Sequence, residues 1–127
     1  MPALNSYDYA IIRVVPRVER GEFLNAGIVL FCRTRRFLQA RIALNHARLA
    51  ALAPRLEVGD VEQALATYPA VCAGGKAAGA LGALPQTERF HWLVAPRSTV
   101  IQTSPVHCGV CADLEHELNR MMERFVL

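Results

Sequence analysis

The sequence predicts an α+β fold, a two-layer sandwich in which helices pack on one face of a mainly antiparallel sheet of about four strands. Three β-rich apolar runs come first and short polar connections join them, which is typical of antiparallel pairing. Segments with helical periodicity and one further strand follow. With 127 residues, 53% of them hydrophobic, the chain can form one core, so we expect residues 1–127 to be a single domain.

The first three predicted strands cover residues 7–16, 25–32 and 37–43. The first, YDYAIIRVVP, and the second, NAGIVLFC, are apolar on nearly both sides, as in covered strands. The third alternates Leu, Ala and Ile with polar residues, which indicates a half-exposed partner. A four-residue polar connection joins the second strand to the third, so these two are expected to form a hairpin.

Helical signals follow the hairpin. Asn45 is a predicted N-cap for a two-turn helix that Pro54 terminates, because the residue before proline avoids helical angles. A second helix is predicted to begin at Asp60, which has capping-box spacing to Gln63, and Pro69 is expected to kink or restart it.

The second half begins with a glycine-rich segment, residues 73–84, which is predicted to be a permissive loop. Thr87 then caps a short predicted helix, and residues 98–103, STVIQT, form the fourth predicted strand. The closing segment 112–126 has one apolar stripe, acidic residues early and arginines late, which predicts an amphipathic helix.

Composition restricts the classes of function. The net charge is +3 without a long basic stripe, so nucleic-acid binding is not expected, although Arg33, Arg35 and Arg36 share one turn. The start lacks the features of a signal peptide and charges interrupt every apolar run, so we expect a cytoplasmic protein that does not span a membrane. The four cysteines are expected to be free thiols.

Several long blocks resemble a known bacterial family. The blocks YAIIRVVPRVERGEFLNAGIVLF at 9–31, CAGG at 72–75, RFHWLVAPRST at 89–99 and the later SPVHCGVCAD are similar to the domain of unknown function family 3037. The resemblance implies no established activity. It implies an accessory or regulatory partner, because genes of the family often neighbour genes for HipA-like kinases.

Cys108 and Cys111 form a CxxC pair that follows His107 and precedes the last helix. This placement is superficially similar to a thioredoxin-type motif, but no βαβ unit precedes it. A zinc site would need further nitrogen or sulfur ligands at a suitable spacing, and a second pair is missing. The family resemblance implies Thr at the position of Cys108, which weakens a redox or metal role for the pair.

The other candidate ligand-binding residues are polar side chains within apolar segments or at turns. They are Arg13, Glu22, Asn25, Arg97, Ser98 and His107. On the structural interpretation, Arg13 or Arg97 forms an ion pair with Glu22 or Glu88. On the functional interpretation, Arg13, Arg97, Ser98 and His107 surround a cleft that binds an anion.

These observations favour a non-enzymatic protein-binding or accessory module that needs no cofactor. The alternative is a small enzyme or anion-binding domain whose site gathers Arg13, Arg97, Ser98 and His107. Convergence of these side chains at one pocket would favour the alternative, and their separation would disfavour it.

Overall fold

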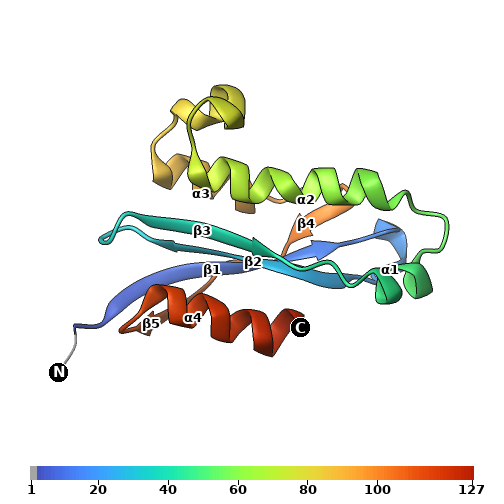
Figure 1. The fold of residues 1–127 in the computed structure, drawn as a ribbon, viewed down its shortest axis with the longest axis horizontal. Helices are drawn as coiled ribbons and strands as arrows, with labels where there is room; N and C mark the ends of the chain where they lie inside the picture. Colours follow the sequence, from blue (N-terminus) through green and yellow to red (C-terminus); the bar gives the residue numbers. More distant parts are fainter. Residues whose placement is uncertain (1–2) are drawn as a thin grey trace.

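A five-stranded antiparallel sheet forms the centre of the computed structural model, which describes residues 3–127 (Figure 1). The strands are β1 (Asn5–Val14), β2 (Leu24–Cys32), β3 (Phe37–Ile42), β4 (Ile101–Thr103) and β5 (His107–Cys111). Their order is β3-β2-β1, and the outer edge of β1 is shared by β4 and β5. β4 pairs with the end of β1 and β5 with its beginning.

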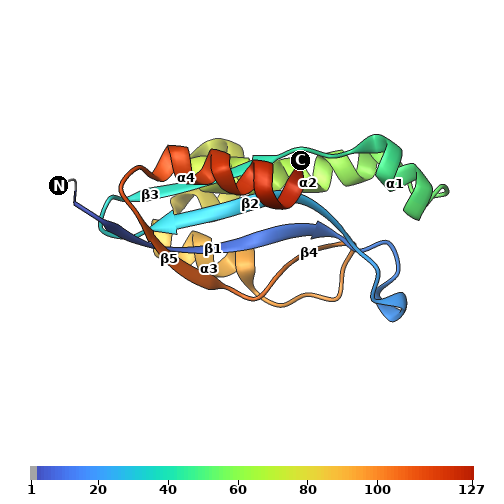
Figure 2. The same cartoon turned by 90° about the horizontal axis from the view of Figure 1, so that it is seen from below.

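Helices cover both faces of this sheet. The helices are α1 (His46–Leu52), α2 (Val58–Ala73), α3 (Gln86–Val94) and α4 (Leu114–Met121), with short helical segments η1 (Val18–Arg20), η2 (Lys76–Ala83) and η3 (Met122–Val126). α2 and α3 lie on one face, and α4 with its π-helical extension η3 lies on the other (Figures 1 and 2). The α+β class is confirmed, but the domain has three layers instead of the predicted two and five strands instead of four.

Two hydrophobic cores explain the third layer. On the α2 side, Ala10, Ile12 and Val14 of β1 pack beneath α2 and α3. On the α4 side, Tyr7 and Ile28 pack against α4 and η3. Because β1 and β2 carry apolar side chains on both sides, each face must be covered to remove that surface from water. We call these clusters the α2-side core and the α4-side core.

A β-bulge interrupts the regular alternation of β2, which supplies side chains to both cores. Ile12 pairs with Gly27 while Arg13 pairs with Asn25, so Ala26 is an extra residue. The bulge shifts the alternation, and Ala26 and Val29 therefore face the same side. A side chain at Gly27 would bring its Cβ to 2.5 Å from the carbonyl oxygen of Arg41 in β3. The close approach of two strands therefore requires glycine here.

The helix ends agree with the sequence in part. Asn45 caps α1 as predicted, and its side-chain oxygen accepts a hydrogen bond of 2.9 Å from the backbone N–H of Arg48. α2 begins before Asp60, which lies within its first turn and is not its cap. Pro69 lies inside α2, which continues as one helix to Ala73. Asp113 caps α4 through the N–H of His116.

Strand β5 was not predicted. Residues 107–111 contain a central glycine and no clear apolar alternation, and they were interpreted as a connection. They become a strand because the first half of β1 offers an unpaired edge, against which Cys111 pairs with Asn5 and His107 with Tyr9. The strand predicted at 98–103 is shorter and begins at Ile101. Among residues 3–127, no helix has the length and apolarity to cross a bilayer.

A buried arginine joins the end of α2 to α3. Arg89 is 9% exposed, and its Nε donates to the carbonyl of Leu84 at 2.9 Å. Its Nη1 donates to the carbonyls of Val71 and Cys72 at 2.8 and 2.7 Å. These carbonyls belong to the last turn of α2, where no intrahelical donor is available. Arg89 therefore satisfies the end of this helix and fixes the glycine-rich segment that follows.

Candidate functional site

Arg13 and Asn25 are brought together by the sheet, on its α4 side. They are direct partners across β1 and β2. The guanidinium carbon of Arg13 lies 4.1 Å from the ring centroid of Phe23, and the side-chain amide of Asn25 donates to the carbonyl of Phe125 at 3.1 Å. Arg13 Nε and Asn25 Oδ1 are buried without a hydrogen-bond partner among the described residues.

Arg97 and Ser98 lie in the connection between α3 and β4, and Arg97 lines a hollow on the α2 side. The guanidinium of Arg97 stacks on Trp92 at 4.2 Å from the ring centroid and donates to the carbonyl of the same residue. Ser98 is exposed. Glu22 forms its ion pair with Arg20. The expected pairing of Arg13 or Arg97 with Glu22 or Glu88 is therefore wrong, because both arginines use an aromatic ring instead.

His107 lies at the start of β5, where its ring is 5.5 Å from that of Tyr9, its partner in the ladder. Tyr9 precedes Arg13 by four residues on β1, which separates their backbones by about 13 Å. Arg97 lies beyond the opposite face of the sheet. The structure thus separates Arg13, Arg97 and His107, and the enzyme alternative lacks the convergence that it requires.

Cys108 and Cys111 point to opposite faces of the sheet, since residues three apart on a strand have opposite orientations. Cys108 pairs with Asp8 and is exposed, whereas Cys111 pairs with Asn5 and packs against the α4-side core. Burial raises the pKa of the Cys111 thiol. This geometry does not favour a dithiol. Residues 3–127 contain no cluster of three or more His, Cys, Asp or Glu side chains suited to a metal ion.

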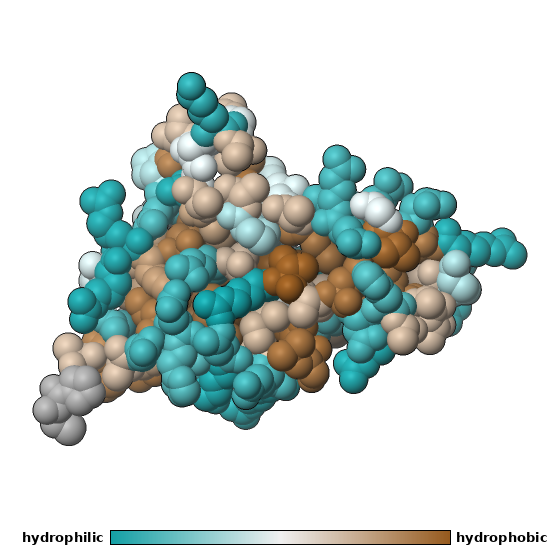
Figure 3. All heavy atoms as spheres, viewed as in Figure 1, coloured by the Kyte–Doolittle hydropathy of each residue, from teal (hydrophilic) through white to brown (hydrophobic). Residues whose placement is uncertain are grey.

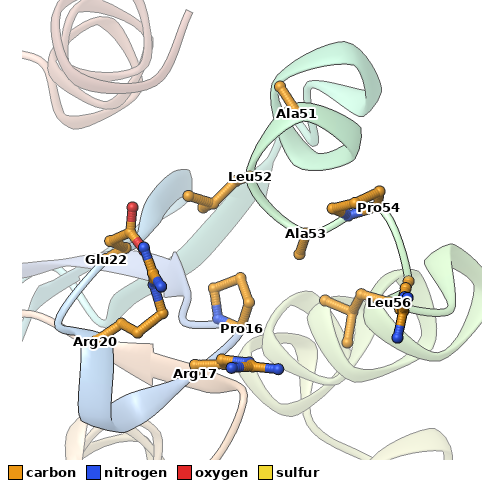
Figure 4. A pocket seen from close by; sticks show the side chains of 10 residues that line it. Pro16, Arg17, Arg20, Glu22, Ala51, Leu52, Ala53, Pro54 and Leu56 are labelled. Carbon is orange, nitrogen blue, oxygen red and sulfur yellow. The ribbon is translucent and has the colours of Figure 1, made fainter.

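The structure forms a different concave site, which we call the basic hollow. Its walls are two segments that are remote in sequence, residues 16–22 between β1 and β2 and residues 51–56, which comprise the end of α1 and the connection that follows it (Figure 4). The volume is about 580 Å³. Gly21, with a φ of 68°, ends η1 and turns the chain back towards β2. The hollow thus lies at the end of the molecule that carries α1.

The charge of the basic hollow is unbalanced. Arg17, Arg20 and Arg55 line it together with a single acid, Glu22. Arg20 is bonded to Glu22, whereas Arg17 and Arg55 form no ion pair with any residue in the described part of the chain. Two guanidinium groups therefore remain available to carboxylates or phosphates of a ligand.

Apolar side chains accompany these arginines. Pro16, Leu52 and Leu56 belong to the same lining. Elsewhere, on the face seen in Figure 3, polar side chains break the apolar surface into small areas. Arginine is enriched in protein interfaces, whose centres are typically apolar. The arrangement can hold an acidic segment that also offers an apolar side chain.

Sequence reasoning did not identify Arg17 and Arg55 as site residues. They are far apart in the chain, and only the packing of α1 beside the β1–β2 connection brings them together. One local signal exists, because each directly follows a proline, Pro16 or Pro54. A proline restricts its connection and can hold a following side chain in a defined place.

Fold and surface together define a small three-layer α+β domain with a basic, partly apolar concave surface. Residues 9–126 match the family described as "Protein of unknown function (DUF3037)", and the chain belongs to this family. The resemblance found in the sequence blocks is confirmed. Neither a curated protein nor a solved structure gives a significant match to the chain.

Proposed function

We propose that the protein is a non-enzymatic accessory module that binds another protein through the basic hollow. The observation that carries the proposal is the unpaired charge of Arg17 and Arg55 beside the apolar lining formed by Pro16, Leu52 and Leu56. An acidic segment with one apolar side chain complements this surface, because carboxylates pair with guanidinium groups and the apolar group packs on Leu52 and Leu56.

The partner class follows from the family. We propose a HipA-like kinase as the partner and the bacterial cytoplasm as the compartment, since family genes often lie beside genes for such kinases. A binding role also agrees with the placement of the polar candidates. Arg13, Arg97 and His107 are held by separate aromatic neighbours and do not form one reaction centre.

The test is co-purification of the protein with a HipA-like kinase after co-expression, followed by measurement of the dissociation constant. We expect a one-to-one complex that weakens as salt is raised, because exposed charge pairs are screened. The double variant Arg17→Glu and Arg55→Glu should bind at least about tenfold more weakly, as expected for losing two charged contacts at an interface.

The matched control reverses two charges at the other end of the molecule. Arg33 and Lys76 are exposed, and Arg33→Glu with Lys76→Glu changes the net charge by the same amount. This control should bind as the wild type does. Equal losses of affinity in both double variants would show that only the net charge matters. Unchanged affinity of the Arg17 and Arg55 variant would show that the basic hollow is not part of the interface.

A further inference from the structure

A second hollow lies on the α2 side of the sheet, away from the residues that line the basic hollow. Tyr68 from α2, Trp92 from α3, and Arg97 and its neighbours before β4 line it. We call it the Tyr68 hollow. Its volume of about 380 Å³ is near the lower end of the range for small-molecule sites.

The hydroxyl of Tyr68 is the unusual group in this hollow. Tyr68 is 3% exposed, and its hydroxyl oxygen is buried without a hydrogen-bond partner among the described residues. A buried hydroxyl without a partner is unfavourable, and buried polar atoms are nearly always satisfied in native proteins. The hydroxyl therefore offers a hydrogen bond to a molecule that enters the hollow.

Arg97 supplies a positive charge beside this hydroxyl. Its guanidinium is held in place by stacking on Trp92 and by one hydrogen bond to the Trp92 carbonyl. Within residues 3–127 it makes no ion pair with a carboxylate, so the rest of its donor fork is available. Burial raises the pKa of Tyr68, and the Arg97 guanidinium partly offsets this effect through its charge and through its N–H groups beside the hydroxyl, which places the two groups next to each other.

The remaining wall decides the class of ligand. Ala64, Val100 and Ile101 contribute apolar surface, and the hydroxyl of Thr99 already donates to the carbonyl of Ile101. A fully hydrated dianion such as phosphate would lose water against this wall without compensation. A carboxylate attached to an apolar body would place its oxygens on Arg97 and Tyr68 and its body on the apolar wall.

We infer that the Tyr68 hollow binds a small organic monocarboxylate, with the Tyr68 hydroxyl and the Arg97 guanidinium as its two donors. The site is independent of the basic hollow and of the protein partner proposed for it. A module with both sites would carry a small-molecule site as well as a partner surface.

The test uses the only tryptophan in the chain, Trp92, as an intrinsic fluorescence probe. Benzoate is titrated into the full-length protein, with benzyl alcohol and inorganic phosphate as comparison probes. We expect a saturable change in fluorescence with benzoate, and much weaker responses to the neutral alcohol and to phosphate. Amide chemical-shift changes measured by NMR should be largest around Thr67 and Thr99, which also line the hollow.

Two variants separate binding from stability. Tyr68→Phe removes only the hydroxyl and should weaken benzoate binding about tenfold, the loss typical of a hydrogen bond to a charged acceptor. Because this hydroxyl has no partner in the free protein, the melting temperature should stay the same or rise. Arg97→Gln should weaken binding at least as much.

The control is Tyr9→Phe, on the α4 side, which should leave benzoate binding unchanged. The inference is overturned if the wild type shows no saturable response at millimolar benzoate. It is equally overturned if benzyl alcohol or phosphate binds as well as benzoate, if Tyr68→Phe binds like the wild type, or if the chemical-shift changes lie elsewhere.

Discussion

Replacing Arg89 by methionine tests how the end of α2 is stabilised. Met has a similar length but no charge and no N–H group, so the carbonyls of Val71, Cys72 and Leu84 lose their donors. Each lost hydrogen bond from a charged donor is worth about 1.5–3 kcal/mol. The buried charge disappears at the same time, which returns part of its desolvation penalty.

The expected net loss is about 3–5 kcal/mol, since the returned desolvation energy offsets only part of three hydrogen bonds. This is a large part of the roughly 5–15 kcal/mol that stabilises a typical domain. With about 2.1 cal/mol/K of unfolding entropy per residue, it lowers the melting temperature by roughly 10–20 °C. Arg89→Lys keeps the charge but loses the planar fork, so we expect an intermediate loss.

Urea unfolding followed by circular dichroism, together with thermal melting, measures this change. The control is Arg48→Met, because Arg48 is exposed on α1 and its substitution should change the free energy of unfolding by less than about 0.5 kcal/mol. A loss below about 1 kcal/mol for Arg89→Met, with an unchanged urea dependence, would refute the role assigned to Arg89.

Three further predictions concern single sites. Gly27→Ala should lower the free energy of unfolding, measured by urea denaturation, by about 2–3 kcal/mol, because its Cβ meets a backbone oxygen at 2.5 Å. The control Gly59→Ala, in α2, has open space around its Cβ and should raise the free energy of unfolding by about 0.5–1 kcal/mol. The hydrogen bond from Arg120 is the main cause that lowers the pKa of the Glu117 carboxyl group. The ionised carboxylate therefore stabilises the fold fully above the ordinary pKa near 4.5, and this stabilisation is lost as pH falls through the lowered pKa. Glu117→Gln should flatten this loss of stability in thermal melts recorded from pH 7 to 3. A thiol reagent should modify exposed Cys108 quickly, whereas Cys72, whose pKa burial raises to about 12, should react only when the protein unfolds; early modification of Cys72 would contradict its placement.

Much of the fold could be predicted from local signals. Residues 25–32 are apolar at nearly every position, which identified β2 as a central strand. Asn45 identified the start of α1 because its side chain competes for backbone N–H groups in a purely local interaction. The number of layers was missed because both sides of β1 and β2 were recognised as apolar, yet the predicted helices were all placed on one face of the sheet, whereas α4 covers the other.

The candidate sites depend on long-range packing and were therefore beyond sequence reasoning. Arg17 and Arg55 meet only because α1 packs against the β1–β2 connection. Tyr68 shares the helical spacing of core residues in α2, and nothing in that spacing shows that its hydroxyl stays unpaired. Arg97 was identified as unusual, but the sequence does not indicate that Trp92 is its aromatic partner.

The position of β1 has a consequence for synthesis of the chain. β1 is synthesised before the other strands of the sheet, yet one of its edges is paired with β4 and β5, whose residues are made about a hundred positions later. The hairpin partner β2 follows directly, so an early β1–β2 ribbon can form, but it stays open on one side and lacks α4 on one face. Such an unpaired, apolar edge favours association between chains. We therefore expect the nascent protein to need protection until the last quarter of its sequence has emerged.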